Sequence, residues 1–313
     1  MIKLQKIADT LTTDEHTLIA ESLRQGEIDG ISLSYLGGAF GPTWSADRDY
    51  SLDFLKHYSG LRALEIQLPA ITSIEAIAEY ASNLEFLSLG EFNQKSVSLK
   101  PLSSLHQLKH LDLNRNNKDI DSISDLANLK ELYLTGYQQA QIELLANLDK
   151  LEELYLGFGT FEELDALKGL SKLKSLEILW VKKLHDLSAL THLDALEHLH
   201  LSTLKQVTSI PEIAHLCHLK SVFMDTMNGL SSLSGLKGCS IRELTVINSR
   251  IDPFIFSPLS NSLPSLQRLL LGLSSKGKTK EALSFFDSKV VCGTLNDLIY
   301  TPNNNGSRIE YCR

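Results

Sequence analysis

Two groups of residues in this chain have the types and spacing that binding chemistry requires. The first is Gly272-Leu-Ser-Ser-Lys-Gly-Lys-Thr279, which matches the phosphate-binding pattern GxxxxGKT and lies between an apolar run and a candidate helix at 280–286. In such a loop Lys278 would reach the β and γ phosphates, and the Thr279 hydroxyl would bind magnesium. That chemistry also needs an α/β domain with a separate acidic magnesium ligand. Nucleotide binding at 272–279 is therefore an alternative, and an exposed basic loop is the simpler interpretation.

The second group is a His-x-His pair, His198 and His200, whose side chains share one face if the segment is a strand. Glu177 precedes His200 by 23 residues and occupies the equivalent position of the preceding repeat. Two imidazoles and a carboxylate could hold zinc, but a structural zinc site needs four ligands. We expect no metal, no cofactor and no catalytic residue. We interpret the cluster as a partner contact that Glu177 makes pH-sensitive by favouring the charged imidazole.

An internal repeat provides the elements that must position these residues. Segments of the form LxxLxL recur eleven times, and 60 of the 313 residues are leucine. The copies begin at Ile28, Leu61, Leu84, Leu108, Leu129, Leu151, Leu173, Leu196, Leu219, Ile241 and Leu266. After a first interval of 33 residues the spacing stays between 21 and 25. A period this steady is the signature of a repeat architecture.

The apolar period changes inside each copy. The fourth and sixth positions are apolar and alternate with polar ones, which predicts a short strand with one buried face. Farther on, apolar residues fall at every third position, as in the row Leu184, Leu187, Leu190, Leu193 and Leu196. A 3₁₀ helix has three residues per turn, so such a row stays on one side of it. Stacked copies of strand, turn and 3₁₀ return would form one continuous core.

These repeats resemble the leucine-rich repeat family, in its short subclass of about 22 residues shared by phosphatase-regulator repeats and bacterial internalins. The resemblance covers Ile28 to about Leu271. It implies an α/β repeat solenoid, a horseshoe with a concave parallel β-sheet and short 3₁₀ or loop segments on the convex side, which binds protein partners. The family's ladder asparagine, at the ninth position of the repeat, is present only as Asn116.

We predict three parts of the chain: an N-terminal helical cap at 1–27, a solenoid at 28–272 and a C-terminal cap at 273–313. A solenoid needs such caps to cover its terminal repeats. Thr12 and Glu15 form a capping box, which predicts an amphipathic helix over residues 13–25.

Two further segments interrupt or follow the repeats. Leu36–Asp49 is an insertion loop whose Phe40 and Trp44 could reach a partner, but we interpret them as folding back over the first repeat. Near the C-terminus, segments 298–300 and 308–311 flank the turn sequence TPNNNGS. They predict a hairpin that closes the last edge of the sheet.

The third, fifth and seventh positions of each repeat face the concave side. They carry seven acidic residues and one base, Arg268, so most of the net negative charge lies on one surface. The acids are Glu65, Asp112, Glu131, Glu153, Glu177, Asp225 and Glu243. Aromatic residues are interleaved with them, and aromatic rings beside charge are typical of interface hot spots. We therefore predict that a partner contacts Asp112, Glu131, Tyr133, Glu153, Tyr155, Glu177, Trp180, His198, His200, Phe223 and Asp225.

Lysine and arginine gather instead at the second position of the repeat. Examples are Arg62, Lys109, Lys174 and Lys220. We interpret them as a basic stripe along the rim that favours solubility.

Composition narrows the class of protein. There are 30 basic and 38 acidic residues, a net charge of −8, whereas nucleic acid binding needs a concentrated basic face. No apolar run approaches the roughly 20 residues that span a bilayer, and the N-terminus lacks a signal-peptide core. We predict a cytoplasmic, monomeric, non-enzymatic protein that binds a basic protein partner and neither nucleic acid nor membrane. The alternative in the same class is an immunity or inhibitor protein that neutralises a basic toxin or effector.

Overall fold

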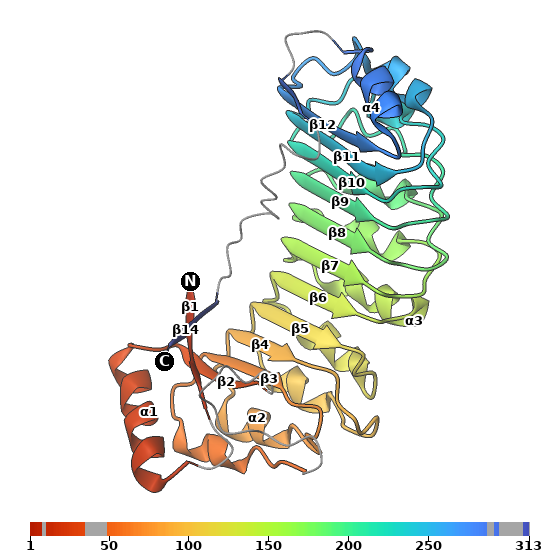
Figure 1. Ribbon diagram of the computed structural model, residues 1–313. Coiled ribbons are helices and arrows are strands. Elements are labelled where there is room, and N and C mark those ends of the chain that lie inside the picture. Colours follow the sequence, from red (N-terminus) through yellow and green to blue (C-terminus); the bar gives the residue numbers. More distant parts are fainter. Residues whose placement is uncertain (8–10, 35–48, 287–290, 294–308, 313) are drawn as a thin grey trace. The chain divides into compact units, whose positions relative to one another are not determined.

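The computed structural model forms two compact units (Figure 1). They comprise Met1–Leu134 with Pro302–Arg313, and Thr135–Thr301. The residues that the structure describes are 1–7, 11–34, 49–286, 291–293 and 309–312. The predicted insertion loop, except for Asp49, and the predicted hairpin arm at 298–300 lie outside these residues.

The first unit alternates strands with short helices. Its strands are β1 (Ile2–Lys6), β2 (Gly30–Ser34), β3 (Ala63–Gln67), β4 (Phe86–Leu89), β5 (His110–Asn114), β6 (Glu131–Thr135) and β14 (Ile309–Cys312). Its α-helices are α1 (Thr13–Gln25) and α2 (Glu75–Tyr80), and its 3₁₀ helices are η1 (Asp53–His57), η2 (Lys100–Ser104) and η3 (Ile120–Asp125). The strand order is β14-β1-β2-β3-β4-β5-β6, with parallel register from β14 to β5.

The second unit repeats this arrangement. Its strands are β7 (Glu153–Gly157), β8 (Ser175–Leu179), β9 (His198–Ser202), β10 (Ser221–Asp225), β11 (Glu243–Ser249), β12 (Arg268–Leu273) and β13 (Val291–Gly293). Its helices are α3 (Gln139–Ile142), α4 (Lys276–Leu283) and the 3₁₀ helices η4 (Glu143–Asn147), η5 (Asp165–Gly169), η6 (Ser188–His192), η7 (Ser234–Leu236) and η8 (Pro253–Leu259). Strands β7 to β13 follow one another in sequence order and are parallel.

The core confirms the two predicted periods. In β8, Leu176 and Ile178 are fully buried, and the residues between and beside them remain partly exposed. In the return segment, Leu190 N donates to Leu187 O at 3.0 Å, and the next two leucines of the row continue these three-residue steps. Burying a leucine side chain contributes about 2 kcal/mol. The repeated leucine rows therefore supply the main stabilisation of each unit.

The predicted N-terminal helix is confirmed, and the cap contains a strand as well. Thr12 N donates to Glu15 Oε2 at 2.8 Å, and Glu15 N donates to Thr12 Oγ1 at 3.3 Å, which completes the capping box at the start of α1. His16 of α1 lies against η1, where its Nδ1 is 2.7 Å from the buried Tyr58 hydroxyl. Its ring stacks on His57 with centroids 4.8 Å apart. Strand β1, which the sequence analysis did not predict, pairs with β2.

The C-terminal hairpin prediction is wrong in the part that the structure describes. The segment 309–312 forms β14, which pairs in parallel with β1 and not at the last edge of the sheet, next to β13. Parallel pairing needs no tight turn between neighbouring strands. The turn sequence TPNNNGS beside this segment was therefore not enough to identify the strand with which the segment pairs.

In the seven repeats that begin at Leu108 to Ile241, the eighth position has a left-handed backbone. Its non-glycine members there have φ between 52° and 57°; they are Arg115, Phe158, Trp180, Thr203, Thr226 and Asn248. Gly136 stands at the same position with φ 85°. This conformation turns the chain out of the strand and lets the eighth N–H bond to the next repeat, as from Trp180 N to Ser202 O at 2.9 Å. It costs L-residues other than glycine roughly 1–2 kcal/mol each.

The ninth position connects successive turns. Asn116 is buried; its Nδ2 donates to Gly90 O at 2.8 Å, and its Oδ1 accepts from Phe92 N at 3.0 Å. Ser249 stands at the same position, and its Oγ accepts from Met227 N at 3.0 Å. Asn116 thus has the ladder role that the resemblance implied, and a serine fills a similar role in the second unit.

Candidate functional site

We call the side of the sheet opposite the leucine rows the open face. Third, fifth and seventh positions of the repeats lie on it, and in β8 to β10 their side chains are mostly intermediate in exposure. All eleven residues predicted to contact a partner belong to the open face or, for Trp180, follow directly after a strand on it.

The structure brings three predicted residues together on β8, β9 and β10. His200 Nδ1 lies 3.6 Å from Glu177 Oε2, an ion pair when the imidazole is protonated. The Phe223 ring packs edge-on against His200, with centroids 4.5 Å apart. His198, on the same strand, instead bonds through Nδ1 to Ser221 Oγ at 2.8 Å. Burial lowers the pKa of His198, which favours its neutral form.

Tyr155 lies along β7 because Gly157 leaves room for it. A Cβ at Gly157 would come within 2.4 Å of the Tyr155 hydroxyl, so any larger residue there would displace the ring. Glu153 precedes Tyr155 on the same face and is partly exposed. This strand therefore presents one carboxylate and one phenol to solvent.

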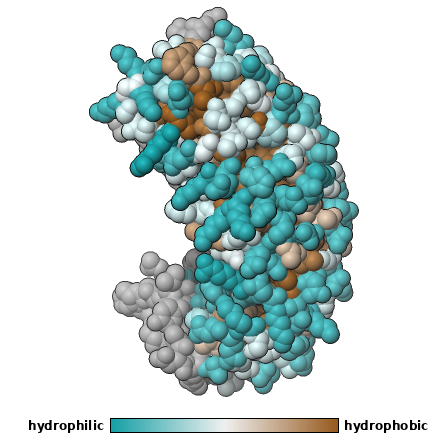
Figure 2. All heavy atoms as spheres, turned by 90° about the vertical axis from the view of Figure 1, so that its right-hand side faces the viewer, coloured by the Kyte–Doolittle hydropathy of each residue, from teal (hydrophilic) through white to brown (hydrophobic). Residues whose placement is uncertain are grey.

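Trp180 and Phe158 form an exposed aromatic pair where β8 and β7 end. Their ring planes differ by 8°, with centroids 6.2 Å apart, and the side chains are 54% and 50% exposed. Hydrophilic residues cover most of the surface that Figure 2 presents, which is the right-hand side of the view in Figure 1, so exposed hydrophobic side chains are the exception there. Large hydrophobic residues this exposed are few among the described residues, and both of these also adopt the left-handed backbone.

Asp225, the last residue of β10, is held by neutral donors. Its Oδ1 accepts from Thr226 Oγ1 and from Asn248 Nδ2, both at 2.9 Å. Its Oδ2 receives only a long bond of 3.4 Å from Ser202 Oγ. In the part of the chain that the structure describes, no lysine, arginine or histidine forms an ion pair with this carboxylate.

In the first unit, Glu131, Tyr133 and Asp112 surround a histidine that the sequence analysis missed. His110 Nδ1 lies 2.9 Å from Glu131 Oε2, and its ring centroid is 5.1 Å from that of Tyr133. The same ring stacks on Phe86 at 4.3 Å. Asp112 accepts a 2.9 Å bond from Ser88 Oγ, and burial raises its pKa. His110 occupies a third position of the repeat, so its position on the open face was readable from the sequence.

Glu65 does not belong to an exposed acidic surface. Glu65 is only 8% exposed, and Ser32 Oγ donates to its Oε2 at 2.5 Å. Phe86, on the neighbouring strand, is 3% exposed and packs in a small cluster with Leu4 and Ala63. The apolar residues that β1 adds explain part of this burial. Glu65 and Phe86 therefore do not belong to the accessible part of the open face in the first unit.

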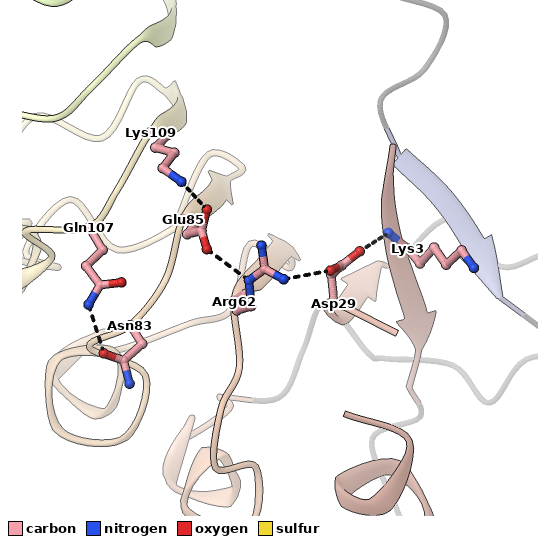
Figure 3. Close-up of polar contacts among 7 residues, drawn as sticks. All are labelled: Lys3, Asp29, Arg62, Asn83, Glu85, Gln107 and Lys109. Atoms are coloured by element: carbon pink, nitrogen blue, oxygen red, sulfur yellow. Dashed lines mark hydrogen bonds and ion pairs between the residues drawn. The ribbon is translucent and has the colours of Figure 1, made fainter. Parts of the chain in front are cut away.

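The second position is a charge ladder in which acids interrupt the bases, and not a continuous basic stripe. In the first unit Arg62 bonds to Asp29 at 3.5 Å and to Glu85 at 2.9 Å, and Glu85 also pairs with Lys109 (Figure 3). In the second unit, Lys174 pairs with Glu152 and Lys220 with Glu197. The prediction of a basic stripe was wrong because it rested on the bases alone and left out the acids at the same repeat position. The paired side chains neutralise one another, so acids break the continuity of the bases along this position.

The GxxxxGKT segment contains a capped helix and not an open phosphate loop. Ser275 Oγ accepts from Lys278 N at 3.2 Å at the start of α4. Thr279 is buried; its hydroxyl accepts from Leu273 N and donates to Ser275 O. The hydroxyl proposed for magnesium is thus already engaged within the fold.

The residues that the structure describes contain neither a metal-binding cluster nor a membrane-spanning helix. Within them, no three or more His, Cys, Asp or Glu side chains are grouped so that they could hold a metal ion. In the same residues, no helix has the length and apolar character needed to cross a membrane.

Parallel strands, 3₁₀ returns and stacked leucine rows define a leucine-rich repeat solenoid. Comparison with solved structures gives the same fold: an internalin (inlF) from Listeria monocytogenes str. 4b F2365 is similar with a TM-score of 0.61 and 18% identity, covering 95% of this chain and 86% of that chain. Internalin C2 of the same strain is also similar, with a TM-score of 0.46 and 20% identity over 72% of this chain and 83% of that one. No protein-family model and no curated protein matches the sequence.

Proposed function

We propose that this chain is a non-enzymatic protein-binding module. Its binding surface is the open face of β7 to β10, with Phe158 and Trp180 at the edge. The observation that carries this proposal is the exposure of two large aromatic rings at backbone angles that favour glycine. Solubility and folding are both served better by a small residue at such a position. Paired exposed aromatic rings are the side chains that supply binding energy at protein interfaces.

The charge of this face favours a basic partner. Its carboxylates on β7 to β10 are Glu153, Glu177 and Asp225, and on the next two strands Glu243 is paired with Arg268 at 3.2 Å. Opposite charge on a partner would speed association, and the aromatic side chains would slow dissociation. An inhibitor that masks a basic toxin or effector would use the same face.

The proposal is tested by affinity capture from a lysate of the organism that encodes the chain. The test variant carries Tyr155→Ser, Glu177→Lys and Phe223→Ser, all at partly exposed positions of the open face. The control carries Asp194→Lys and Glu212→Ser, at exposed positions away from these strands. We expect a basic protein that the wild type and the control retain and the test variant loses. Identical captures by all three proteins, each shown to be folded by circular dichroism, would contradict the proposal.

A further inference from the structure

The open face of the first unit contains a hollow where β2 to β6 begin. Its volume is about 180 Å³, and its apolar lining residues are Ile2, Ala63 and Phe86. Ala63 and Phe86 are 1% and 3% exposed and form its bottom, and the partly buried Ile2 of β1 packs against their cluster. The third positions on β2 and β3 are only Gly30 and Ala63, so these two strands contribute no large side chain to this part of the face.

The other lining residues are ionisable and are paired with one another. They are Asp29, Arg62, Glu85, Lys109, His110 and Glu131. The first four are consecutive members of the charge ladder, and each forms an ion pair with the next (Figure 3). In the remaining pair, the histidine Nδ1 lies 2.9 Å from the glutamate Oε2. An additional ion of either sign would compete with one of these pairs, whereas an uncharged group would leave all of them intact.

The charged residues also contribute apolar surface to the hollow. The side chains of Arg62 and Lys109 are 58% and 54% exposed, and both head groups bond to Glu85, so their methylene stems line the mouth. The ring of His110 stacks on Phe86 with centroids 4.3 Å apart and adds an aromatic edge. Most of the surface that lines the hollow is therefore apolar, although most of its residues carry charge.

The size of the hollow limits what it can hold. An apolar cavity of about 150 Å³ holds one benzene molecule, whereas sites for whole small molecules measure about 300–1,000 Å³. A volume of about 180 Å³ therefore fits one large side chain, such as that of phenylalanine or leucine, better than a complete ligand.

We propose that this hollow binds one uncharged, apolar side chain of a partner protein, of the size of phenylalanine or leucine. Such a side chain would cover the exposed part of Ile2 and the stems of Arg62 and Lys109 without breaking an ion pair. A buried apolar anchor inside a ring of polar groups is the arrangement that carries most of the binding energy in many protein interfaces. The site lies in the first unit, and it goes beyond the proposed function, which concerns β7 to β10 of the second.

The test is an NMR titration of the full-length protein, ¹³C-labelled at its isoleucine and alanine methyl groups, with N-acetyl-L-phenylalaninamide. The comparison probes are N-acetylglycinamide, N-acetyl-L-lysinamide and the α-amide of N-acetyl-L-glutamic acid. The readouts are the methyl signals of Ile2 and Ala63. We expect saturable shifts with the phenylalanine probe and at least about tenfold weaker binding of the other three, because they bury less apolar surface.

Variants on β1 locate the binding site. Ile2→Ala removes one wall and should weaken binding of the phenylalanine probe about threefold, measured at the Ala63 methyl group, since roughly 30 Å² of apolar contact is lost. Lys3→Ala is the matched control, because Lys3 is exposed on the same strand and its side chain points away from the charge ladder (Figure 3). It should leave binding unaltered.

The comparison of probes uses the wild type alone, so it holds whether or not a variant folds. The absence of a saturable shift, equal binding of all four probes, or tightest binding of the lysine or glutamate probe would overturn the proposal. Equal effects of Ile2→Ala and Lys3→Ala would place the probe elsewhere and overturn it as well. The titration contains no partner protein, so its failure and the failure of the capture experiment are separate results.

Discussion

Asn116 offers a direct measure of what the ninth position contributes to the fold. Its side chain satisfies two buried backbone groups of the preceding repeat, Gly90 O and Phe92 N. Asn116→Ala removes both partners at once. An unsatisfied buried donor or acceptor costs about 1–3 kcal/mol, so we expect a loss of about 2–4 kcal/mol in the free energy of unfolding after some relaxation.

The assay is urea unfolding followed by circular dichroism, with the slope of the transition used to check that the denatured state is unchanged. Asn117→Ala is the matched control, because Asn117 is exposed and its amide bonds only to Arg115 O, at 3.2 Å. Its effect should stay within about 0.5 kcal/mol. Exchange of the Phe92 amide hydrogen should accelerate in Asn116→Ala. If the two variants have equal stability, the ninth-position hydrogen bonds are not the source of stabilisation that the geometry indicates.

Three further perturbations test other parts of the fold. Gly136→Ala places a Cβ at a φ of 85° and should cost about 1 kcal/mol in urea unfolding, whereas a neutral effect would show that the left-handed position is not strained. Glu85→Gln removes a carboxylate bonded to Lys109 and Arg62 and should cost up to about 1 kcal/mol at low salt and less at high salt; equal losses at both would argue against an ionic contribution. Burial and then His57 lower the pKa of His16, so its folded pKa lies below its unfolded value of about 6.5. Its contribution to stability is therefore full above pH 6.5 and decreases as pH falls from there toward the folded pKa, which is measured as a difference in pH dependence between the wild type and His16→Gln.

The regular part of the fold could be predicted because it depends on apolar spacing alone. Leu176 and Ile178 show the two-residue period of a strand, and Leu187 and Leu190 show the three-residue step of the return. The pairing of β14 with β1 could not be predicted in this way, because no local pattern in the sequence says which distant strand a short terminal segment will join.

The sequence predicted which polar side chains lie on the open face, but it predicted only some of the contacts between them. Repeat numbering placed Glu177 and His200 opposite one another, and the structure confirms their proximity at 3.6 Å. His110 was missed beside Glu131, although it stands at the same kind of position, because only the acidic and aromatic residues of these repeats were considered. The acidic members of the charge ladder were missed for the related reason that only bases were counted at the second position.

The eighth position separates the demands of folding from those of binding. Every repeat that turns out of its strand there needs a left-handed residue, and glycine or asparagine satisfies this most easily, as Gly136 and Asn248 do. Phe158 and Trp180 satisfy it at a cost and expose half of their side chains to water. The stability of the solenoid does not explain why two adjacent repeats have a large aromatic residue at this position. They are explained if the rings have a partner, and the eighth position of a repeat is therefore a place where sequence alone can indicate a binding site.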